Sequence, residues 1–291
     1  MIDRIAAAPI SWGICEVPGW GLQMSPSRIL GEMAELGITK TELGALGWLP
    51  DEVTELLPLL DRYGMSILGG FVPLVLHHGT DHPGSLEAAH AAAKTLSAAG
   101  AQYFVAAVIS SMESWDRPTL DATEWSNLFE GIAETEKVAA EYGLTQVVHP
   151  HVNTLIETAE EFERFLDNSS APFCLDTGHL FIGGADPVAI AREHRDRVGL
   201  VHIKDVDAAI SDRFRAGEFD WMGAIQNGLF PSAGSGDAPI AATVRTLVQS
   251  GYSGWYVLEQ DVALTDGEPP FGEGPVHGVR KSIEYLKSLA G

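Results

Sequence analysis

Apolar, β-rich runs alternate with segments of helical periodicity along the whole chain. The first kind is rich in branched and aromatic residues, and the second repeats apolar positions every three to four residues. The predicted strands cover residues 4–13, 39–44, 66–76, 102–109, 145–151, 172–179, 200–205 and 254–261. The predicted helices cover residues 27–37, 51–64, 85–100, 122–143, 158–169, 187–199, 238–251 and 275–290.

This alternation is typical of a (β/α)8 TIM barrel. A doubly wound open sheet is the alternative, but such a sheet usually carries a Gly-rich phosphate loop after its first strand. The segment "SWGICEVPGWG" at 11–21 is not such a loop. No linker or shift in composition divides the chain, so we predict a single domain over residues 1–291. The long non-periodic stretch 206–237 follows the seventh predicted strand, where a loop of this length is more often functional than accidental.

The charge of the chain narrows the choice of partners. Lys and Arg total 18 against 40 Asp and Glu, which gives a net charge of −22. Such a field repels phosphate backbones and anionic membranes, so a small neutral substrate or a cation is the expected partner. No run approaches the roughly 20 apolar residues of a membrane span, and the polar N-terminus does not resemble a signal peptide. With two cysteines 159 positions apart, read as reduced thiols, we expect a soluble cytoplasmic protein.

Ionisable side chains collect at the predicted strand ends, where barrel enzymes build their active sites. They are Glu42, His77, His78, His149, His151, Asp176, His179, His202, Lys204, Asp205 and Glu259. Taken singly, each has an ordinary explanation, such as helix capping by Asp176 or a surface pair of Lys204 with Asp205. Together, converging carboxylates and imidazoles would be costly without a partner, and a divalent cation removes that cost. Mixed nitrogen and oxygen ligands suit Mn, Co, Fe or Zn better than Ca.

Three motifs make the pattern specific. "LDTGH" (175–179), "VHIKD" (201–205) and "VLEQD" (257–261) resemble the sixth, seventh and eighth strand ends of the xylose isomerase-like TIM-barrel superfamily. "APISW" (8–12) and "TELG" (41–44) resemble its first two strands. The superfamily includes sugar epimerases, inosose isomerase and inosose dehydratase, and its members bind one divalent metal through Glu, Asp, His and Glu on strands five to eight. The resemblance assigns the last three ligands to Asp176, His202 and Glu259.

The fifth strand departs from that pattern, because it ends in "HPH" (149–151) without a carboxylate. The run "HPHVNTLIET" (149–158) is similar to the His-rich strand of inosose dehydratases. By that register His149 is the fourth metal ligand and His151 faces the substrate, although the two could exchange roles. An imidazole in place of a carboxylate raises the net charge of the site by one and makes a stronger Lewis acid.

The resemblance implies a lyase that dehydrates a keto-cyclitol or keto-sugar such as 2-keto-myo-inositol through a metal-stabilised enolate. We assign catalytic roles to His151, His179, Glu157 and Lys204, with desolvation expected to lower the pKa of Lys204. We assign substrate contacts to Glu42, His77, Trp12 and Trp221. Trp20, Trp48 and Phe71 either join them or belong to the core, and the turn with Gly234, Gly236 and Asp237 is read as structural. Mn is the first choice of metal, with Co, Fe, Mg or Zn as alternatives.

Other functions remain open from the sequence. An isomerase or epimerase shares the enolate, and an eliminase would release the aglycone of a 3-keto glycoside. A non-catalytic metal-binding barrel would exchange no substrate proton. Endonuclease relatives need a basic groove, which the net charge of −22 argues against. Relatives of this kind are often oligomers, so self-association is a further expectation by analogy.

Overall fold

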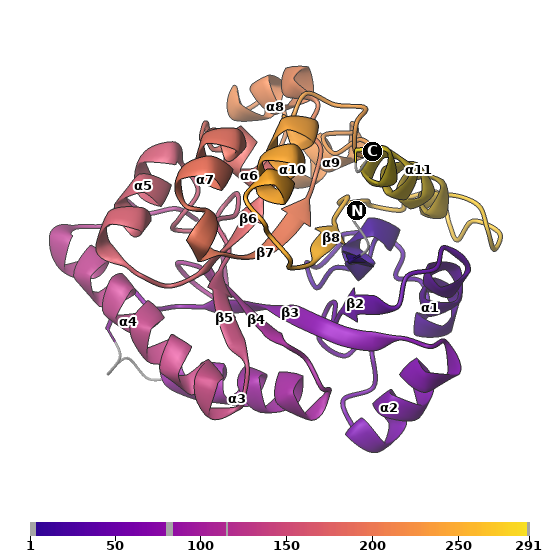
Figure 1. Ribbon diagram of the computed structural model, residues 1–291, viewed down its shortest axis with the longest axis horizontal. Coiled ribbons are helices and arrows are strands. Elements are labelled where there is room, and N and C mark those ends of the chain that lie inside the picture. The colour runs from indigo at the N-terminus through magenta and orange to yellow at the C-terminus, as the bar shows by residue number, and fades with distance from the viewer. Residues whose placement is uncertain (1–3, 80–83, 115, 290–291) are drawn as a thin grey trace.

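The computed structural model describes residues 4–79, 84–114 and 116–289. Eight parallel strands form a closed barrel in chain order, which confirms the predicted (β/α)8 architecture (Figure 1). The strands are β1 (Ile5–Ala7), β2 (Lys40–Glu42), β3 (Ser66–Leu74), β4 (Tyr103–Val108), β5 (Thr145–Val148), β6 (Phe173–Asp176), β7 (Val198–Ile203) and β8 (Tyr256–Leu258).

Helices surround the barrel (Figure 1). They are α1 (Pro26–Glu35), α2 (Val53–Arg62), α3 (Ser85–Ala98), α4 (Ala122–Glu141), α5 (Ala159–Asn168), α6 (Thr177–Ile182), α7 (Pro187–Glu193), α8 (Ala208–Arg215), α9 (Trp221–Gln226), α10 (Ile240–Gln249) and α11 (Pro275–Ser288). Two 3-10 helices, η1 (Pro9–Trp12) and η2 (Arg195–Arg197), follow β1 and precede β7. None of the helices in these described ranges combines the length and apolar character needed to cross a bilayer.

Most of the strands, β1 and β5 among them, are shorter than their predicted runs, and residues 177–179 of the sixth predicted strand instead begin α6. β1 stops at Ala7, and Pro9 then begins η1, because proline has no N–H to donate to the strand ladder. β5 stops at Val148, so both histidines of "HPH" lie just past the strand. Their rings still meet, with centroids 5.5 Å apart, as expected for two side chains on one face.

The stretch 206–237 contains two short helices where the sequence pattern predicted only a loop. Asp207 begins α8 by accepting a hydrogen bond from the Ile210 N–H (3.0 Å), and Asp220 begins α9 by accepting one from the Gly223 N–H (2.7 Å). Each helix is too short to show an apolar period, so the pattern of the sequence did not predict it. Together they form a cover beside the barrel mouth.

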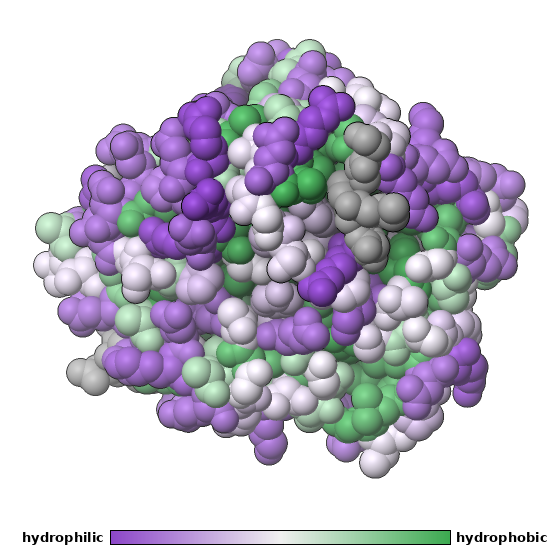
Figure 2. All heavy atoms as spheres, viewed as in Figure 1, coloured by the Kyte–Doolittle hydropathy of each residue, from purple (hydrophilic) through white to green (hydrophobic). Residues whose placement is uncertain are grey.

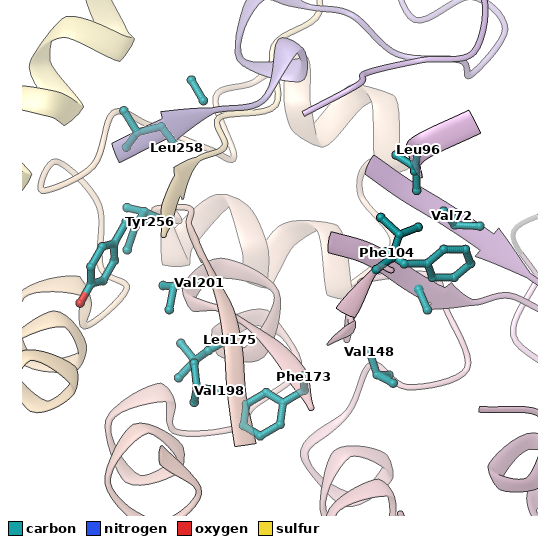
Figure 3. Packing of buried hydrophobic residues seen from close by; sticks show 14 of the residues in the cluster. Val72, Leu96, Phe104, Val148, Phe173, Leu175, Val198, Val201, Tyr256 and Leu258 are labelled. Atoms are coloured by element: carbon teal, nitrogen blue, oxygen red, sulfur yellow. The ribbon is translucent and has the colours of Figure 1, made fainter. Parts of the chain in front are cut away.

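Small and branched side chains fill the inside of the barrel. Ala6, Ala8, Leu68, Val105, Val147, Cys174, Leu200 and Val257 form this inner cluster and are buried. A larger layer lies between the strands and the helices, where Phe104, Phe173 and Val148 pack with their neighbours (Figure 3). Hydrophilic side chains spread over much of the outer face in Figure 2, as the strong net charge requires.

Asp205 anchors the turn that precedes α10. Its carboxylate accepts hydrogen bonds from the backbone N–H groups of Gly234 (2.7 Å), Gly236 (2.9 Å) and Ala238 (3.1 Å). A Cβ at Gly236 would lie 2.6 Å from an oxygen of Asp205, so only glycine fits there. Asp205 is buried and does not form a surface pair with Lys204, which corrects that reading of the motif.

Candidate metal centre and active site

Side chains from the ends of β5 to β8 converge at the mouth of the barrel. His149 Nε2 lies 3.4 Å from Asp176 Oδ2, and His202 Nδ1 lies 3.8 Å from the same oxygen. His202 Nδ1 also lies 3.2 Å from Glu259 Oε2. His149, Asp176 and His202 are almost fully buried, and Glu259 is only slightly exposed. The four residues predicted as metal ligands therefore form one cluster.

The donor atoms of this cluster suit a divalent cation. Among the described residues, buried His202 Nδ1 and Glu259 Oε2 take part in no hydrogen bond of good geometry, although Glu259 Oε2 lies 3.1 Å from the Lys204 ammonium. One donor atom each from His149, Asp176, His179 and Glu259 lies within 4.8 Å of the others, and Glu42, His202 and Glu259 form a second such group. Burying such nitrogen and oxygen atoms without a partner costs folding free energy. A cation that binds to them would remove that cost. His179, predicted as catalytic, thus also lies close enough to contact a cation bound between His149, Asp176 and Glu259.

The pKa of His202 also indicates that this cluster favours a bound cation. Burial lowers its pKa, but Cys174, Glu259 and Glu42 outweigh that effect and hold the pKa well above the ordinary value. The site therefore has an excess of negative charge that attracts a cation to the atoms around His202 Nδ1. This potential favours a metal for the same reason that it favours a proton.

Glu42 orients His202 rather than facing the cavity alone. The Nε2–H of His202 donates to Glu42 Oε1 over 3.0 Å, and Glu42 is 4% exposed. A carboxylate bound to the outer nitrogen of a metal-binding histidine fixes the tautomer and directs the other nitrogen to the metal. Glu42 is predicted to bind substrate hydroxyls; it lines the cavity, but its carboxylate is hydrogen-bonded to His202.

Removing the Glu42 carboxylate should weaken metal binding. In Glu42→Ala we expect the affinity for Mn²⁺ to fall about 10- to 100-fold, as for other outer partners of metal ligands. Glu42→Gln should recover part of the loss, because its amide oxygen still accepts from Nε2–H. Equilibrium dialysis measures both, with Glu284→Gln, exposed on α11 and outside the cavity lining, as the control. An unchanged affinity in Glu42→Ala would show that His202 needs no such partner.

Two further histidines stack beside the cluster. The rings of His151 and His179 have centroids 3.8 Å apart. His151 Nδ1–H donates to the Val152 carbonyl (2.6 Å), so its lone pair is on Nε2. Burial, reinforced by His149 and Lys204, lowers the pKa of His151 to about 3, and burial also lowers that of His179. Both rings are therefore neutral, which is the form that can accept a proton.

Lys204 is a buried cation between two carboxylates. Its ammonium forms ion pairs with Glu259 (3.1 Å) and Asp261. Burial alone would lower its pKa, but Asp261 and Glu259 outweigh burial and raise the pKa instead. The expectation of a lowered Lys204 pKa is therefore wrong, because these two carboxylates were not placed beside it. A permanently charged Lys204 suits charge stabilisation better than proton transfer.

A cavity of about 750 Å³ opens beside the cluster. Glu42, His149, His151, Lys204 and Glu259 line it, and so do Trp221, Trp20 and Phe71. Asp261 lines it as well and was not among the predicted site residues, although it ends the motif "VLEQD". The signal for Asp261 was its place two residues after Glu259, on the same side of an extended chain.

Of the predicted site residues, Asp176, His179 and His202 belong to the cluster beside the cavity and do not line it. Three others lie away from both the cavity lining and the cluster. Trp12 is fully buried, and its indole N–H donates to Glu32 Oε2 over 2.9 Å. His77 packs on His78, with ring centroids 3.9 Å apart, near the N-terminus of α4. Glu157 pairs with Arg117 (3.0 Å) and accepts from the Asn153 N–H (2.7 Å), which ties down the loop after β5. We therefore withdraw substrate contacts for Trp12 and His77 and a catalytic role for Glu157.

Trp221 is an aromatic residue whose ring lies near both members of the histidine pair. Its ring centroid lies 6.3 Å from that of His151 and 6.4 Å from that of His179. The α8–α9 cover thus brings Trp221 against the site, as its substrate-binding assignment requires. Trp48 instead donates its indole N–H to the Met24 carbonyl (2.8 Å) and lies outside the cavity lining.

Comparison with known proteins identifies a family and several similar enzymes. A sequence model described as xylose isomerase-like TIM barrel matches residues 30–289. An inosose dehydratase of Geobacillus kaustophilus is 29% identical over 98% of this chain and 94% of its own length. The rhizopine catabolism protein MocC of Rhizobium meliloti is 31% identical over 92% of this chain and 85% of its own.

Solved structures share the fold at low sequence identity. The IolI protein, crystallised with a bound zinc atom, superposes with a TM-score of 0.71 at 13% identity and covers 98% of this chain and 97% of its own. A D-allulose 3-epimerase from Methylomonas sp. superposes with a TM-score of 0.70 at 17% identity, with the same coverage. A 3-keto-D-glucoside 4-epimerase from E. coli gives 0.65 at 16% identity, over 98% and 99%. These likenesses concern the fold.

Proposed function

Because the chain belongs to the xylose isomerase-like TIM-barrel family, we propose that it is a metal-dependent lyase that removes water from a cyclic polyhydroxylated ketone such as 2-keto-myo-inositol. The observation that carries this proposal is the buried cluster of His149, Asp176, His202 and Glu259 beside the neutral pair His151 and His179. The full-length similarity to an inosose dehydratase supports the choice of substrate.

His149, Asp176, His202 and Glu259 would hold one divalent ion, with Mn²⁺ as our first choice and His179 within reach. Such an ion polarises a ketone oxygen and stabilises the negative charge that develops when the neighbouring C–H loses its proton. A zinc atom in the related IolI structure supports a metal in this fold without deciding its identity.

The remaining residues supply proton transfer and charge. His151 lines the cavity with its lone pair on Nε2, and it takes the α-proton as the general base. The His151–His179 pair then returns a proton to the departing β-hydroxyl as its C–O bond breaks. Lys204 stays charged between Glu259 and Asp261 and stabilises the developing negative charge. Trp221 covers the apolar side of the ring.

An isomerase or epimerase is the second candidate, because epimerases share the fold and proton abstraction beside a ketone serves both reactions. Proton NMR of the products of 2-keto-myo-inositol separates the two, with the Mn-loaded enzyme removed before recording. We expect loss of water to an unsaturated ketone or its dione tautomer. An epimer with no loss of water would contradict the lyase and support the isomerase.

A further inference from the structure

The cavity at the barrel mouth exceeds the needs of one sugar ring. Its volume of about 750 Å³ lies in the range that accommodates ligands of drug size. One water molecule occupies about 30 Å³ in the liquid. An unsubstituted six-membered polyol ring occupies only a few times that volume, which is much less than the cavity offers. Space for a second part of the ligand therefore adjoins the metal centre.

The two parts of the cavity differ in chemistry. One part is lined by segments 43–46 and 70–73, by α3 and by Met112, and we call it the apolar lobe. Among the described residues that line this lobe, only Thr95 has a polar side chain. The lining carboxylates, imidazoles and amine, including Glu42, His149 and Lys204, come from other segments. The apolar lobe cannot bind hydroxyl groups as the metal end does.

The local structure of β3 creates this lobe. The pairing of β2 with β3 shifts register after Thr41, and beyond it Phe71 faces the histidines, with ring centroids 6.0 Å from His149 and 5.7 Å from His151. Gly70 points the other way, since a Cβ there would lie 2.9 Å from Leu96 of α3. Phe71 thus lies between the ring site and the lobe.

The rim of the lobe exposes large apolar side chains. Leu46 is 86% exposed and Met112 is 69% exposed. On α3, Ala88 and Ala91 line the lobe and are exposed. Contiguous exposed apolar surface next to a polar site marks a binding surface. Because the lobe is continuous with the metal end, one ligand that has both a polar ring and an apolar part matches it.

We propose that the substrate is an uncharged cyclic polyhydroxy ketone with an apolar, ether-linked substituent that occupies the apolar lobe. This inference rests on the proton abstraction of the proposed function and goes beyond it, because the leaving group is an alcohol instead of water. The α-carbon loses its proton to His151, and the β-carbon–oxygen bond breaks with its electron pair going to oxygen. That oxygen takes a proton and leaves as an apolar alcohol, while the ring becomes an unsaturated ketone. No oxidant or reductant is needed.

Binding of unreactive glycosides tests the lobe apart from catalysis. Calorimetry with phenyl and methyl β-D-glucopyranoside on the Mn-loaded enzyme should give an affinity at least about 10-fold higher for the phenyl compound, since its ring leaves water in the lobe. Ala91→Glu, at an exposed lining position of α3, should abolish this difference. Ala98→Glu, exposed on the same helix but outside the lining, should retain it.

The outcomes separate the lobe from the proposed reaction. Equal binding of the two glycosides, or a phenyl preference that survives Ala91→Glu, would overturn the inference. Self-association in sedimentation velocity that Ala91→Glu abolishes, without any phenyl preference, would assign the surface to a second copy of the chain and also overturn it. A phenyl preference without proton exchange in the corresponding 3-keto glycosides would overturn the ether-linked substrate, and exchange in 2-keto-myo-inositol would then still support the proposed function.

Discussion

Asp176→Asn and Glu259→Gln should each lower turnover of a keto-cyclitol at least about 10³-fold while the fold is retained. In the proposed function the two carboxylates are metal ligands, so their loss should remove the metal. A metal supplies several kcal/mol of transition-state stabilisation, and each 1.4 kcal/mol is a factor of ten in rate. The fold should survive in Asp176→Asn because Asp176 Oδ1 caps α6 by accepting from the N–H groups of Gly178 and His179 (both 2.8 Å), and an Asn side chain keeps that oxygen.

A matched control for this substitution lies on the next helix. Asp186 caps α7 by accepting from the Val188 N–H (2.9 Å) on the surface, away from the cavity lining. Asp186→Asn should therefore leave both turnover and bound metal unchanged. Elemental analysis, kinetics and thermal unfolding of the three variants check the prediction. Full turnover in either Asp176→Asn or Glu259→Gln would show that the cluster is not the catalytic centre.

Replacing the two histidines of "HPH" separately should divide their roles. His149→Ala should lose the metal, because His149 lies 3.4 Å from Asp176 and is buried in the cluster. His151→Ala should keep the metal but lose about 10²- to 10⁴-fold in turnover, as expected for removal of a general base. Metal content by mass spectrometry and kcat by NMR distinguish the two, with exposed His277→Ala as the control.

The alternative outcomes of this pair are informative. If both variants lost the metal, both histidines would be ligands and the base would lie elsewhere, with His179 as the next candidate. If His151→Ala lost the metal and His149→Ala did not, the assignment of the two residues would be reversed. Equal turnover in all three variants would remove both histidines from the mechanism.

The barrel itself was predictable because its determinants are local. Apolar period, Gly and Pro punctuation and capping residues are read within short windows, and they placed all eight strands in the correct order. The boundaries were less predictable where proline intervened, as at Pro9 after β1 and Pro150 after β5. The helices α8 and α9 were missed because each is shorter than the window in which a period is visible.

Side-chain roles depend on partners that are distant in sequence, and these were harder to foresee. Strand-end position brought His149, Asp176, His202 and Glu259 together correctly, because parallel strand ends meet at one edge. It could not show that Glu42 pairs with His202 across 160 positions, or that Asp261 holds Lys204. The sequence also could not distinguish Trp12, whose indole N–H donates to Glu32, from Trp221, whose ring lies near His151.

The central claim is that this cluster removes a proton beside a ketone when it holds a metal. Deuterium incorporation into 2-keto-myo-inositol in D₂O tests it most directly, because lyase and isomerase both pass through this step. We expect exchange at a carbon next to the ketone with the Mn-loaded enzyme, none after chelation, and recovery when Mn²⁺ is restored. Exchange that persists after complete chelation, or its absence from both this ketone and 3-keto glycosides, would contradict the account.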